Sequence, residues 1–334
     1  MHKRRLGPDG PMVSAIGLGA MSFAGIYGEA SEAQSHEVLD AAREVGIDHL
    51  DTSNVYGAGR SESIVGAYLA RQGKGARDIF TIATKGGITK DPATGARRFD
   101  NTKAHLTEEL DGSLKRLGVE CVDLYYVHRR DPSLPIEEVT ETLAGFVKAG
   151  KTRAIGYSEI APSSLRRAAA VHRVAAVQSE YSLGVRAPEL GLVRACEELG
   201  TALVAFSPVG RGVLTDHPPT REAIDGIDFF KGNPRFMEPN FSANEAYLRG
   251  FRALAAKMGT NTAALANAWL LARSPCVIPI PGTRSAAHLR ELAAGGDMEL
   301  SDADMARIEA VLPCGWAHGD RYSAAQWVGP ERYS

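Results

Sequence analysis

Four polar side chains with complementary chemistry stand at the ends of short apolar runs. Asp51 ends one run, Lys85 directly follows a second, and His128 directly follows a third. Tyr56 lies in the turn after Asp51, just before two glycines. If these runs are neighbouring parallel strands, their carboxyl ends meet, and a carboxylate, an ammonium, an imidazole and a phenol converge on one spot.

This set of groups suits the reduction of an aldehyde or a ketone to the alcohol. A phenol is a usable general acid once its pKa, ordinarily about 10, is brought nearer to neutrality, and the charge of Lys85 would do this for Tyr56. Asp51 would hold that ammonium, and His128 would orient the carbonyl oxygen. Because protein side chains do not donate hydride, the reaction needs a nicotinamide.

Eight short apolar runs alternate with helical patterns along the chain. They span residues 14–19, 47–51, 79–84, 122–127, 153–157, 175–177, 202–206 and 276–280. The alternation predicts a parallel sheet covered by helices, and eight units favour a closed (β/α)8 TIM barrel formed by residues 1–334 as one domain. The turn at 7–11 predicts an N-terminal β-hairpin, and an extra helix at 301–312 precedes a C-terminal loop.

Local signals place the helix ends. Ser31 and Gln34 have the spacing of a capping box, Ser301 is a further expected N-cap, and Asn101 is expected to cap the helix before the third of the site's strands. The segment 209–240 is too long for a simple connection, so it is predicted to cover the cofactor or face the substrate.

Composition excludes several classes of partner. The formal net charge is -2, from 38 Lys and Arg against 40 Asp and Glu, which gives no electrostatic basis for binding nucleic acid or an anionic membrane. No apolar run is long enough for a transmembrane helix, and no secretory signal is expected. The four cysteines form no C-x-x-C pair, so no metal site is predicted and a cytoplasmic location is expected. The sequence leaves monomer and homo-oligomer equally open.

In this order along the chain, several segments together resemble the aldo-keto reductase superfamily over essentially the whole length. They are Gly17-Leu18-Gly19-Ala20-Met21, Asp51-Thr52-Ser53-Asn54-Val55-Tyr56-Gly57, Ala83-Thr84-Lys85, Asp123-Leu124-Tyr125-Tyr126-Val127-His128, Ile155-Gly156-Tyr157-Ser158, Gln178-Ser179-Glu180-Tyr181, Phe206-Ser207-Pro208-Val209-Gly210-Arg211 and Ile280-Pro281-Gly282-Thr283-Arg284. The stretch around 233–236 looks most like a bacterial and plant branch that includes pyridoxal reductases.

The resemblance implies a catalytic tetrad of Asp51, Tyr56, Lys85 and His128, and NADPH/NADP+ as cofactor. It implies that Tyr181 stacks on the nicotinamide while Ser158 and Gln178 bind its carboxamide. The other implied cofactor-binding residues are Gly19, Met21, Asp51, Ser207, Pro208, Val209, Gly210, Arg211, Pro281, Gly282, Thr283, Arg284, His288 and Glu291. An arginine at position 284 would favour NADPH over NADH, because a guanidinium binds phosphate through charge-assisted hydrogen bonds.

Three positions depart from the family pattern. Glu159 replaces an asparagine often found after the strand-end serine, and an acid beside the nicotinamide amide is unusual. Leu292 replaces an adenine-side asparagine, and His288 occupies an arginine-like position. In the tail, Trp316 is open to either a pocket-lining or a packing role.

Two other hypotheses belong to different classes. One is a cofactor-sensing regulatory subunit of the same fold with little turnover, like the β subunits of potassium channels. The other is a barrel lyase that uses Lys85 as a Schiff base. Negligible turnover on every carbonyl would favour the first, and a borohydride-trapped adduct on Lys85 would support the second.

Overall fold

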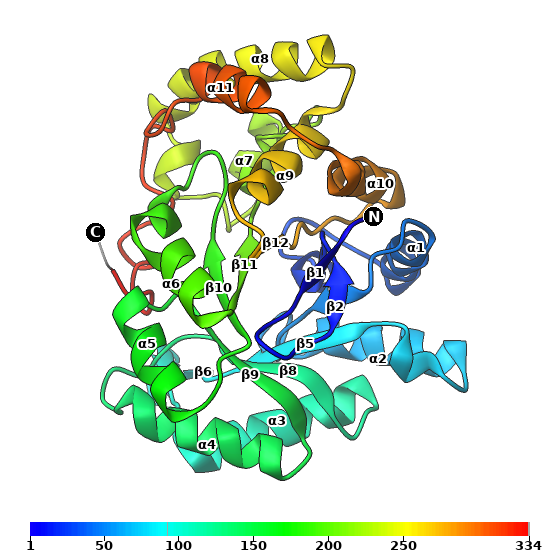
Figure 1. Cartoon of the computed structure of the whole chain (residues 1–334), viewed down its shortest axis with the longest axis vertical. Helices are drawn as coiled ribbons and strands as arrows, with labels where there is room; N and C mark the ends of the chain where they lie inside the picture. The colour runs from blue at the N-terminus through cyan, green and yellow to red at the C-terminus, as the bar shows by residue number, and fades with distance from the viewer. Residues whose placement is uncertain (92, 333–334) are drawn as a thin grey trace.

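Eight parallel strands form the centre of the molecule and carry the predicted site at their carboxyl ends (Figure 1). The computed structural model of the chain describes residues 1–91 and 93–332. In spatial order the strands are β3 (Leu18–Gly19), β4 (His49–Asp51), β5 (Thr81–Gly86), β8 (Val122–Val127), β9 (Thr152–Ser158), β10 (Ala176–Glu180), β11 (Ala202–Phe206) and β12 (Val277–Pro279). The amide N–H groups of Gly17 and Gly19 donate to the carbonyls of Pro279 and Pro281 at 2.9 and 3.0 Å, which joins the first strand to the last. The predicted (β/α)8 barrel is confirmed.

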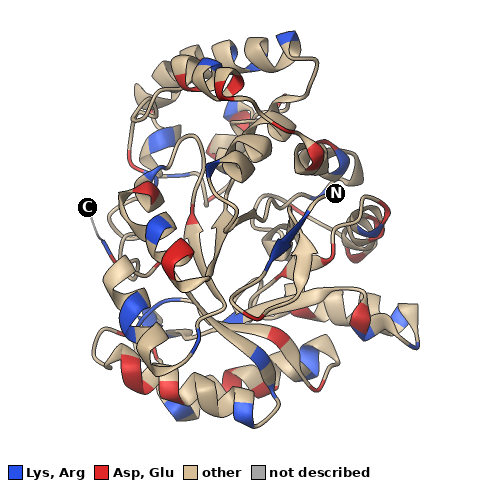
Figure 2. Cartoon of the chain, viewed as in Figure 1, with Lys and Arg blue, Asp and Glu red and all other residues tan. Residues whose placement is uncertain are grey.

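Helices on the outside of the sheet follow the strands in chain order. They are α1 (Glu32–Glu44), α2 (Arg60–Gln72), α3 (Lys103–Leu117), α4 (Ile136–Lys148), α5 (Pro162–Val171), α6 (Leu192–Leu199), α7 (Arg221–Gly226), α8 (Asn240–Lys257), α9 (Thr262–Arg273), α10 (Ala286–Ala293) and α11 (Asp302–Val311). The last of these is the predicted extra helix, and it packs against α8 away from the barrel (Figure 1). Acidic and basic residues are interspersed over these outer helices (Figure 2). None of the helices in the described part of the chain has the length and apolarity needed to cross a membrane.

The N-terminal hairpin covers the end of the barrel interior opposite the site. Strands β1 (Lys3–Arg5) and β2 (Met12–Ser14) pair in antiparallel register, as the turn signal predicted. Leu6 and Val13 on this hairpin pack with strand residues such as Leu124 and Ile278 in one buried cluster. Each such side chain contributes about 1.5–3 kcal/mol through its burial, so the hairpin stabilises the end of the barrel opposite the site.

The helix-capping predictions were right in two cases and wrong in one. Ser31 and Gln34 form the expected capping box, and Ser301 caps α11. The N-cap of α3 is Thr102, not Asn101. The Asn101 side chain instead bonds the backbone of Arg129 and Asp131, so it fixes the loop after β8.

Several short elements in long connections were not predicted. Strands β6 (Ile88–Lys90) and β7 (Arg97–Phe99) form a hairpin between β5 and α3. Short 3-10 turns, η1 (Ala20–Ala24) and η4 (Gly210–Gly212), follow β3 and β11. These connections leave the carboxyl ends of the strands, and they therefore form the walls of the site.

Candidate active site

The four predicted catalytic groups lie together at the carboxyl ends of β4, β5 and β8. The Lys85 ammonium, fully buried, donates to the Asp51 carboxylate, to the Thr52 carbonyl at 2.8 Å and to the Tyr56 hydroxyl at 3.4 Å. The rings of Tyr56 and His128 meet edge to face with centroids 5.8 Å apart. Asp51, Tyr56 and His128 line one large cavity, whereas Lys85 lies behind them and does not.

Both members of the Lys85–Asp51 ion pair have a further hydrogen-bond partner, Tyr56 for the ammonium and Gln178 for the carboxylate. Burial alone would lower the pKa of Lys85, but the charge of Asp51 and the contact with Tyr56 outweigh it and raise that pKa. Gln178 donates its amide N–H to the other oxygen of the Asp51 carboxylate at 2.7 Å. The ammonium is therefore a fixed positive charge, which opposes the Schiff-base hypothesis, because a nucleophilic amine must be deprotonated and accessible.

The protonation of the phenol and the imidazole follows from burial. Burial raises the pKa of Tyr56, and the opposing charge of Lys85 is the smaller effect, so the pKa does not fall toward neutrality as the sequence analysis expected. Burial also lowers the pKa of His128 well below its usual range, helped by the charges of Arg129, Lys85 and Arg97. At neutral pH the site therefore holds a protonated phenol beside a neutral imidazole.

His128 is oriented by a neighbour that the sequence analysis did not single out. Its Nδ1 shares a hydrogen bond of 3.1 Å with the Ser53 hydroxyl, which is fully buried after β4. When Ser53 is the donor in this bond, the proton of the neutral ring lies on Nε2. The Nε2–H of His128 is then available as a hydrogen-bond donor.

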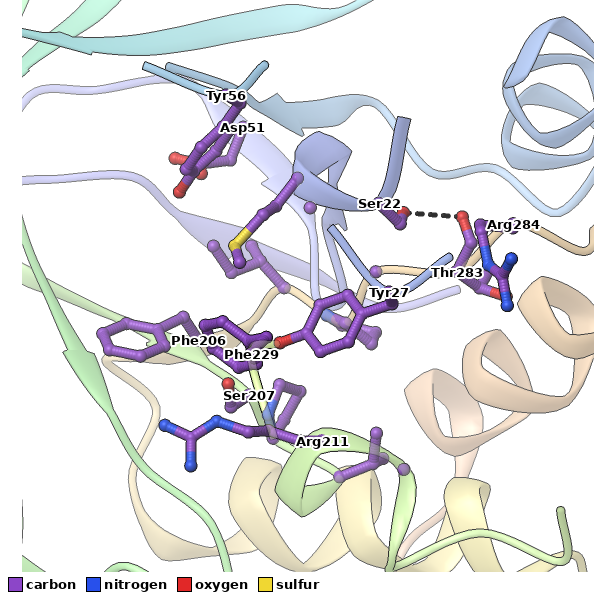
Figure 3. A pocket seen from close by; sticks show the side chains of 18 of the residues that line it. Ser22, Tyr27, Asp51, Tyr56, Phe206, Ser207, Arg211, Phe229, Thr283 and Arg284 are labelled. Atoms are coloured by element: carbon purple, nitrogen blue, oxygen red, sulfur yellow. Dashed lines mark hydrogen bonds between the residues drawn. The ribbon is translucent and has the colours of Figure 1, made fainter. Parts of the chain in front are cut away.

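The cavity has a volume of about 760 Å³ and extends from Asp51, Tyr56 and His128 to the start of α10. Figure 3 shows Asp51 and Tyr56 at the upper left and Thr283 and Arg284 at the right, with Ser207 and Arg211 along the lower side. Of the predicted cofactor residues, fifteen line it: Gly19, Met21, Asp51, Ser158, Gln178, Ser207, Pro208, Val209, Arg211, Pro281, Gly282, Thr283, Arg284, His288 and Glu291. An elongated ligand with several polar groups fits a cavity of this shape.

Two predicted cofactor residues, Tyr181 and Gly210, do not line the cavity. The Tyr181 ring is fully buried edge to face with Trp269, and its hydroxyl donates to Glu189 at 2.8 Å. The prediction that Tyr181 stacks on a nicotinamide is therefore wrong for this structure. Phe206 ends β11 and lines the cavity instead, where it is an available aromatic surface (Figure 3).

Several rim residues have strained backbones. Glu159, Ser207 and Arg211 have φ angles of 56°, 50° and 58°, a left-handed conformation that non-glycine residues rarely adopt. Added Cβ atoms at Gly19 and Gly282 would lie 2.9 and 2.6 Å from backbone oxygens, so only glycine permits this close approach of β3 to the chain after β12. Strained turns and close backbone approach are features of sites that bind phosphate-bearing ligands.

Glu159, the unusual acid, does not face the cavity. Its carboxylate binds the guanidinium of Arg321 and accepts the backbone N–H of Glu180 at 2.8 Å. Arg321 also binds Glu180, and Glu180 in turn binds Arg211 at 3.1 Å. These four side chains form a buried ionic network that attaches the C-terminal tail to the rim. The two terminal nitrogens of Arg211 are thus bound by the protein, one to the Arg321 carbonyl and the other to Glu180.

Loop residues that the sequence analysis missed cover the middle of the cavity. Tyr27, which follows η1, and Phe229 from the 209–240 segment meet edge to face with centroids 5.1 Å apart (Figure 3). From the tail, Tyr322 and Gln326 line the cavity, while Trp316 is buried and donates to the Leu183 carbonyl at 2.9 Å. Such contacts between distant loops carry no periodic signal in the sequence.

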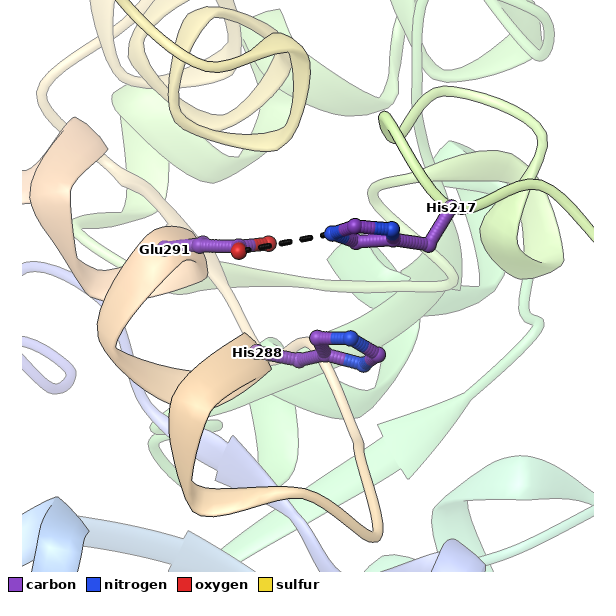
Figure 4. Close-up of side chains that lie close together, drawn as sticks. All are labelled: His217, His288 and Glu291. Carbon is purple, nitrogen blue, oxygen red and sulfur yellow. Dashed lines mark ion pairs between the residues drawn. The ribbon is translucent and has the colours of Figure 1, made fainter.

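At the α10 end, His217 lies beside two predicted residues. Its ring stacks on His288 with centroids 4.7 Å apart, and its Nε2 lies 3.5 Å from the Glu291 carboxylate (Figure 4). The donor atoms of the three side chains all lie within 4.8 Å of one another, so this set could also hold a metal ion, which the sequence analysis did not foresee.

Nearby, the exposed Arg284 donates to the Glu29 carbonyl at 2.9 Å and takes part in no ion pair among the described residues.

Comparison with known proteins agrees with this geometry. Residues 15–313 match the model of the aldo/keto reductase family. The chain is 38% identical over 322 residues to aldo-keto reductase yakc (NADP(+)) of Schizosaccharomyces pombe, which covers 96% of this chain and 94% of that protein. It is 36% identical over 327 residues to aldo-keto reductase str7 of Strobilurus tenacellus, covering 95% and 94%.

Two solved structures have the same architecture. The glycerol dehydrogenase AKR11B4 from Gluconobacter oxydans is 28% identical, with a TM-score of 0.81 over 93% of this chain and 94% of that one. The holo form of the aldo-keto reductase AKR11C1 from Bacillus halodurans is 24% identical, with a TM-score of 0.78 over 98% and 99%, and supports the fold alone. On the match over residues 15–313 and the identity to these relatives, the chain belongs to the aldo/keto reductase family.

Proposed function

We propose that the protein is an NADPH-dependent reductase that converts an aldehyde or a ketone to the alcohol, with Tyr56 as proton donor. The observation that carries the proposal is the contact of the buried Lys85 ammonium with the Tyr56 hydroxyl at 3.4 Å, at one end of a cavity of about 760 Å³. The name of the yakc relative, which specifies NADP(+), supports the choice of cofactor.

The residues of the cavity fit a nicotinamide dinucleotide. Ser158 and Gln178 present polar groups beside Asp51, and Phe206 offers an aromatic face at the same end. Thr283 and Arg284 lie at the other end, where Ser285 caps α10. A guanidinium at a helix start favours a phosphate, so Arg284 is the residue that selects the 2′-phosphate. When bound, the nicotinamide supplies the hydride that no side chain provides.

The protein's own groups supply the proton and the orientation. With Ser53 as donor to its Nδ1, neutral His128 carries its proton on Nε2, donates a hydrogen bond to the carbonyl oxygen and turns it toward the phenol. Tyr56 then transfers its proton to that oxygen as negative charge develops there. Because Lys85 is a fixed cation next to the phenol, it stabilises the phenolate that remains, and Asp51 keeps Lys85 in place.

The regulatory-subunit hypothesis has no specific observation in its favour, since the named relatives are called aldo-keto reductases. The test is NADPH oxidation, followed at the nicotinamide absorbance, with a panel of aromatic and aliphatic aldehydes and ketones. Turnover of at least one class, faster with NADPH than with NADH, is the expected result. Tight nucleotide binding without turnover of any carbonyl would contradict the proposal.

A further inference from the structure

Two guanidinium groups lie at the catalytic end of the cavity without a carboxylate partner. Arg129 directly follows His128, and Arg97 projects from the β6–β7 hairpin; both line the cavity together with Tyr56 and His128. Neither takes part in an ion pair with any residue in the ranges 1–91 and 93–332. A guanidinium that faces a cavity and lacks a counterion is a site for an anion.

In each of these two arginines one terminal nitrogen is hydrogen-bonded to the protein, and the other N–H groups of the guanidinium bond to none of the described residues. In Arg97 one terminal nitrogen donates to two tail carbonyls, Ala325 at 3.1 Å and Val328 at 2.7 Å. In Arg129 one terminal nitrogen donates to the His128 carbonyl at 2.6 Å and to the Ser158 hydroxyl at 2.9 Å. The other N–H groups of both guanidinium groups have no acceptor among the described residues. Both side chains are thus positioned by the protein, with donors left for a ligand.

Two buried arginines elsewhere at the rim, by contrast, are paired with carboxylates. Arg211 pairs with Glu180, and Arg321 pairs with both Glu159 and Glu180. At the catalytic end no such carboxylate in the described part of the chain pairs with Arg97 or Arg129. The pKa of Arg97 is lowered by partial burial and by the charge of Arg129. An anion bound by both guanidinium groups would supply the missing counter-charge.

We propose that the carbonyl substrate bears an anionic group, a carboxylate or a phosphate, that Arg97 and Arg129 bind while the carbonyl lies at Tyr56 and His128. This inference rests on the proposed reductase function and specifies its substrate class. Apolar side chains from three different segments, Met21, Ile88 and Phe206, also line the cavity and would contact the body of the substrate. Arg284 lies just before α10 at the opposite end and does not serve this anion.

The test compares anionic aldehydes with neutral counterparts. The first pair is 4-formylbenzoate and its neutral amide, 4-formylbenzamide. The second is 4-formylphenyl phosphate and neutral 4-methoxybenzaldehyde. The two pairs distinguish a carboxylate from a phosphate preference. For the preferred anion, kcat/KM should exceed that of its neutral partner by about tenfold to hundredfold, the range for hydrogen bonds to a charged group.

The variant Arg97→Gln should reduce this anion-to-neutral ratio by about tenfold, chiefly through KM, and Arg97→Lys should restore part of it. Arg98→Gln is the matched control: Arg98 is the next residue on the same strand, but it pairs with Asp100 and does not line the cavity, so the ratio should not change.

Equal kcat/KM for both members of both pairs would overturn the inference and leave the reductase function intact. A preference that survives Arg97→Gln undiminished would overturn the role of Arg97. If none of the four aldehydes, and no other carbonyl, is reduced with NADPH, the proposed function itself fails. The substrate comparison uses the unaltered protein, so it remains decisive even if a variant does not fold.

Discussion

The Lys85 ammonium lies 3.4 Å from the Tyr56 hydroxyl, and it reaches this position from the interior rather than from the cavity. The cation is therefore shielded from bulk solvent, where its effect on the phenol would be weakened by screening. The phenol and the imidazole line the cavity, but the amine does not. In the proposed mechanism Lys85 is therefore an electrostatic support for proton transfer, and Tyr56 is the group at the reacting oxygen.

The pH dependence of reduction should follow the phenol. Because burial raises the pKa of Tyr56, the protonated form that reduction needs persists through neutral pH. The rate constant kcat for reduction should be level from about pH 6 to 9 and decline only above about pH 10, the ordinary value for tyrosine. Initial rates at saturating cofactor and substrate check this. A decline centred near pH 7 would show that the phenol is more acidic than the structure indicates.

The buried network at the tail should control both stability and the attachment of the tail. Arg321→Met leaves the Glu159 carboxylate buried without its partner, which should destabilise the protein by about 3–5 kcal/mol. Denaturant unfolding measures this loss, and limited proteolysis should cleave the tail of the variant sooner. Arg332→Met, an exposed change that removes only a contact with the Trp327 ring, should cost no more than about 0.5 kcal/mol. Equal stability of the two variants would contradict the role of the network.

The same network predicts a loss of stability in acid. Burial would raise the pKa of Glu159, but the charge and hydrogen bonds of Arg321 outweigh it and lower that pKa. The folded state therefore binds this proton less readily than the unfolded state. The stabilisation is present above the unfolded value of about 4.3 and is lost as the pH falls through the lower folded value. Unfolding curves at pH 3 and pH 7 should differ more for the unaltered protein than for Arg321→Met; an unchanged difference would rule out this linkage.

Cofactor choice should depend on Arg284. Its guanidinium is exposed at the start of α10 and has no ion-pair partner among the described residues, so it is available for the 2′-phosphate. Arg284→Gln should weaken NADPH binding by about tenfold to hundredfold and leave NADH binding nearly unchanged. Fluorescence titration with each nucleotide measures both. The control Arg290→Gln, within α10 and paired with Glu44, should alter neither. A parallel loss of NADH affinity in Arg284→Gln would argue against phosphate selection.

The sequence predicted what depends on short-range pattern. Strand and helix alternation determined the barrel, and the groups at strand ends, such as Asp51 and Lys85, follow because parallel strands direct their carboxyl ends to one rim. The unusual acid at position 159 could be noted but not explained, since its partner Arg321 lies far away in the chain. The role of Tyr181 was taken from the resemblance alone, and the structure buries its ring against Trp269 while Phe206 lines the cavity. The contact of Tyr27 with Phe229 joins two irregular loops, and no periodicity encodes it.

The most direct test of the account is Tyr56→Phe, which removes one hydroxyl and keeps the ring that packs against His128. Single-turnover reduction of a good aldehyde by pre-bound NADPH should slow by about 10²–10⁴-fold, the range for a lost general acid, while the dissociation constant for NADPH stays within about twofold. A Tyr56→Phe protein that reduces the aldehyde at the original rate would show that another group delivers the proton.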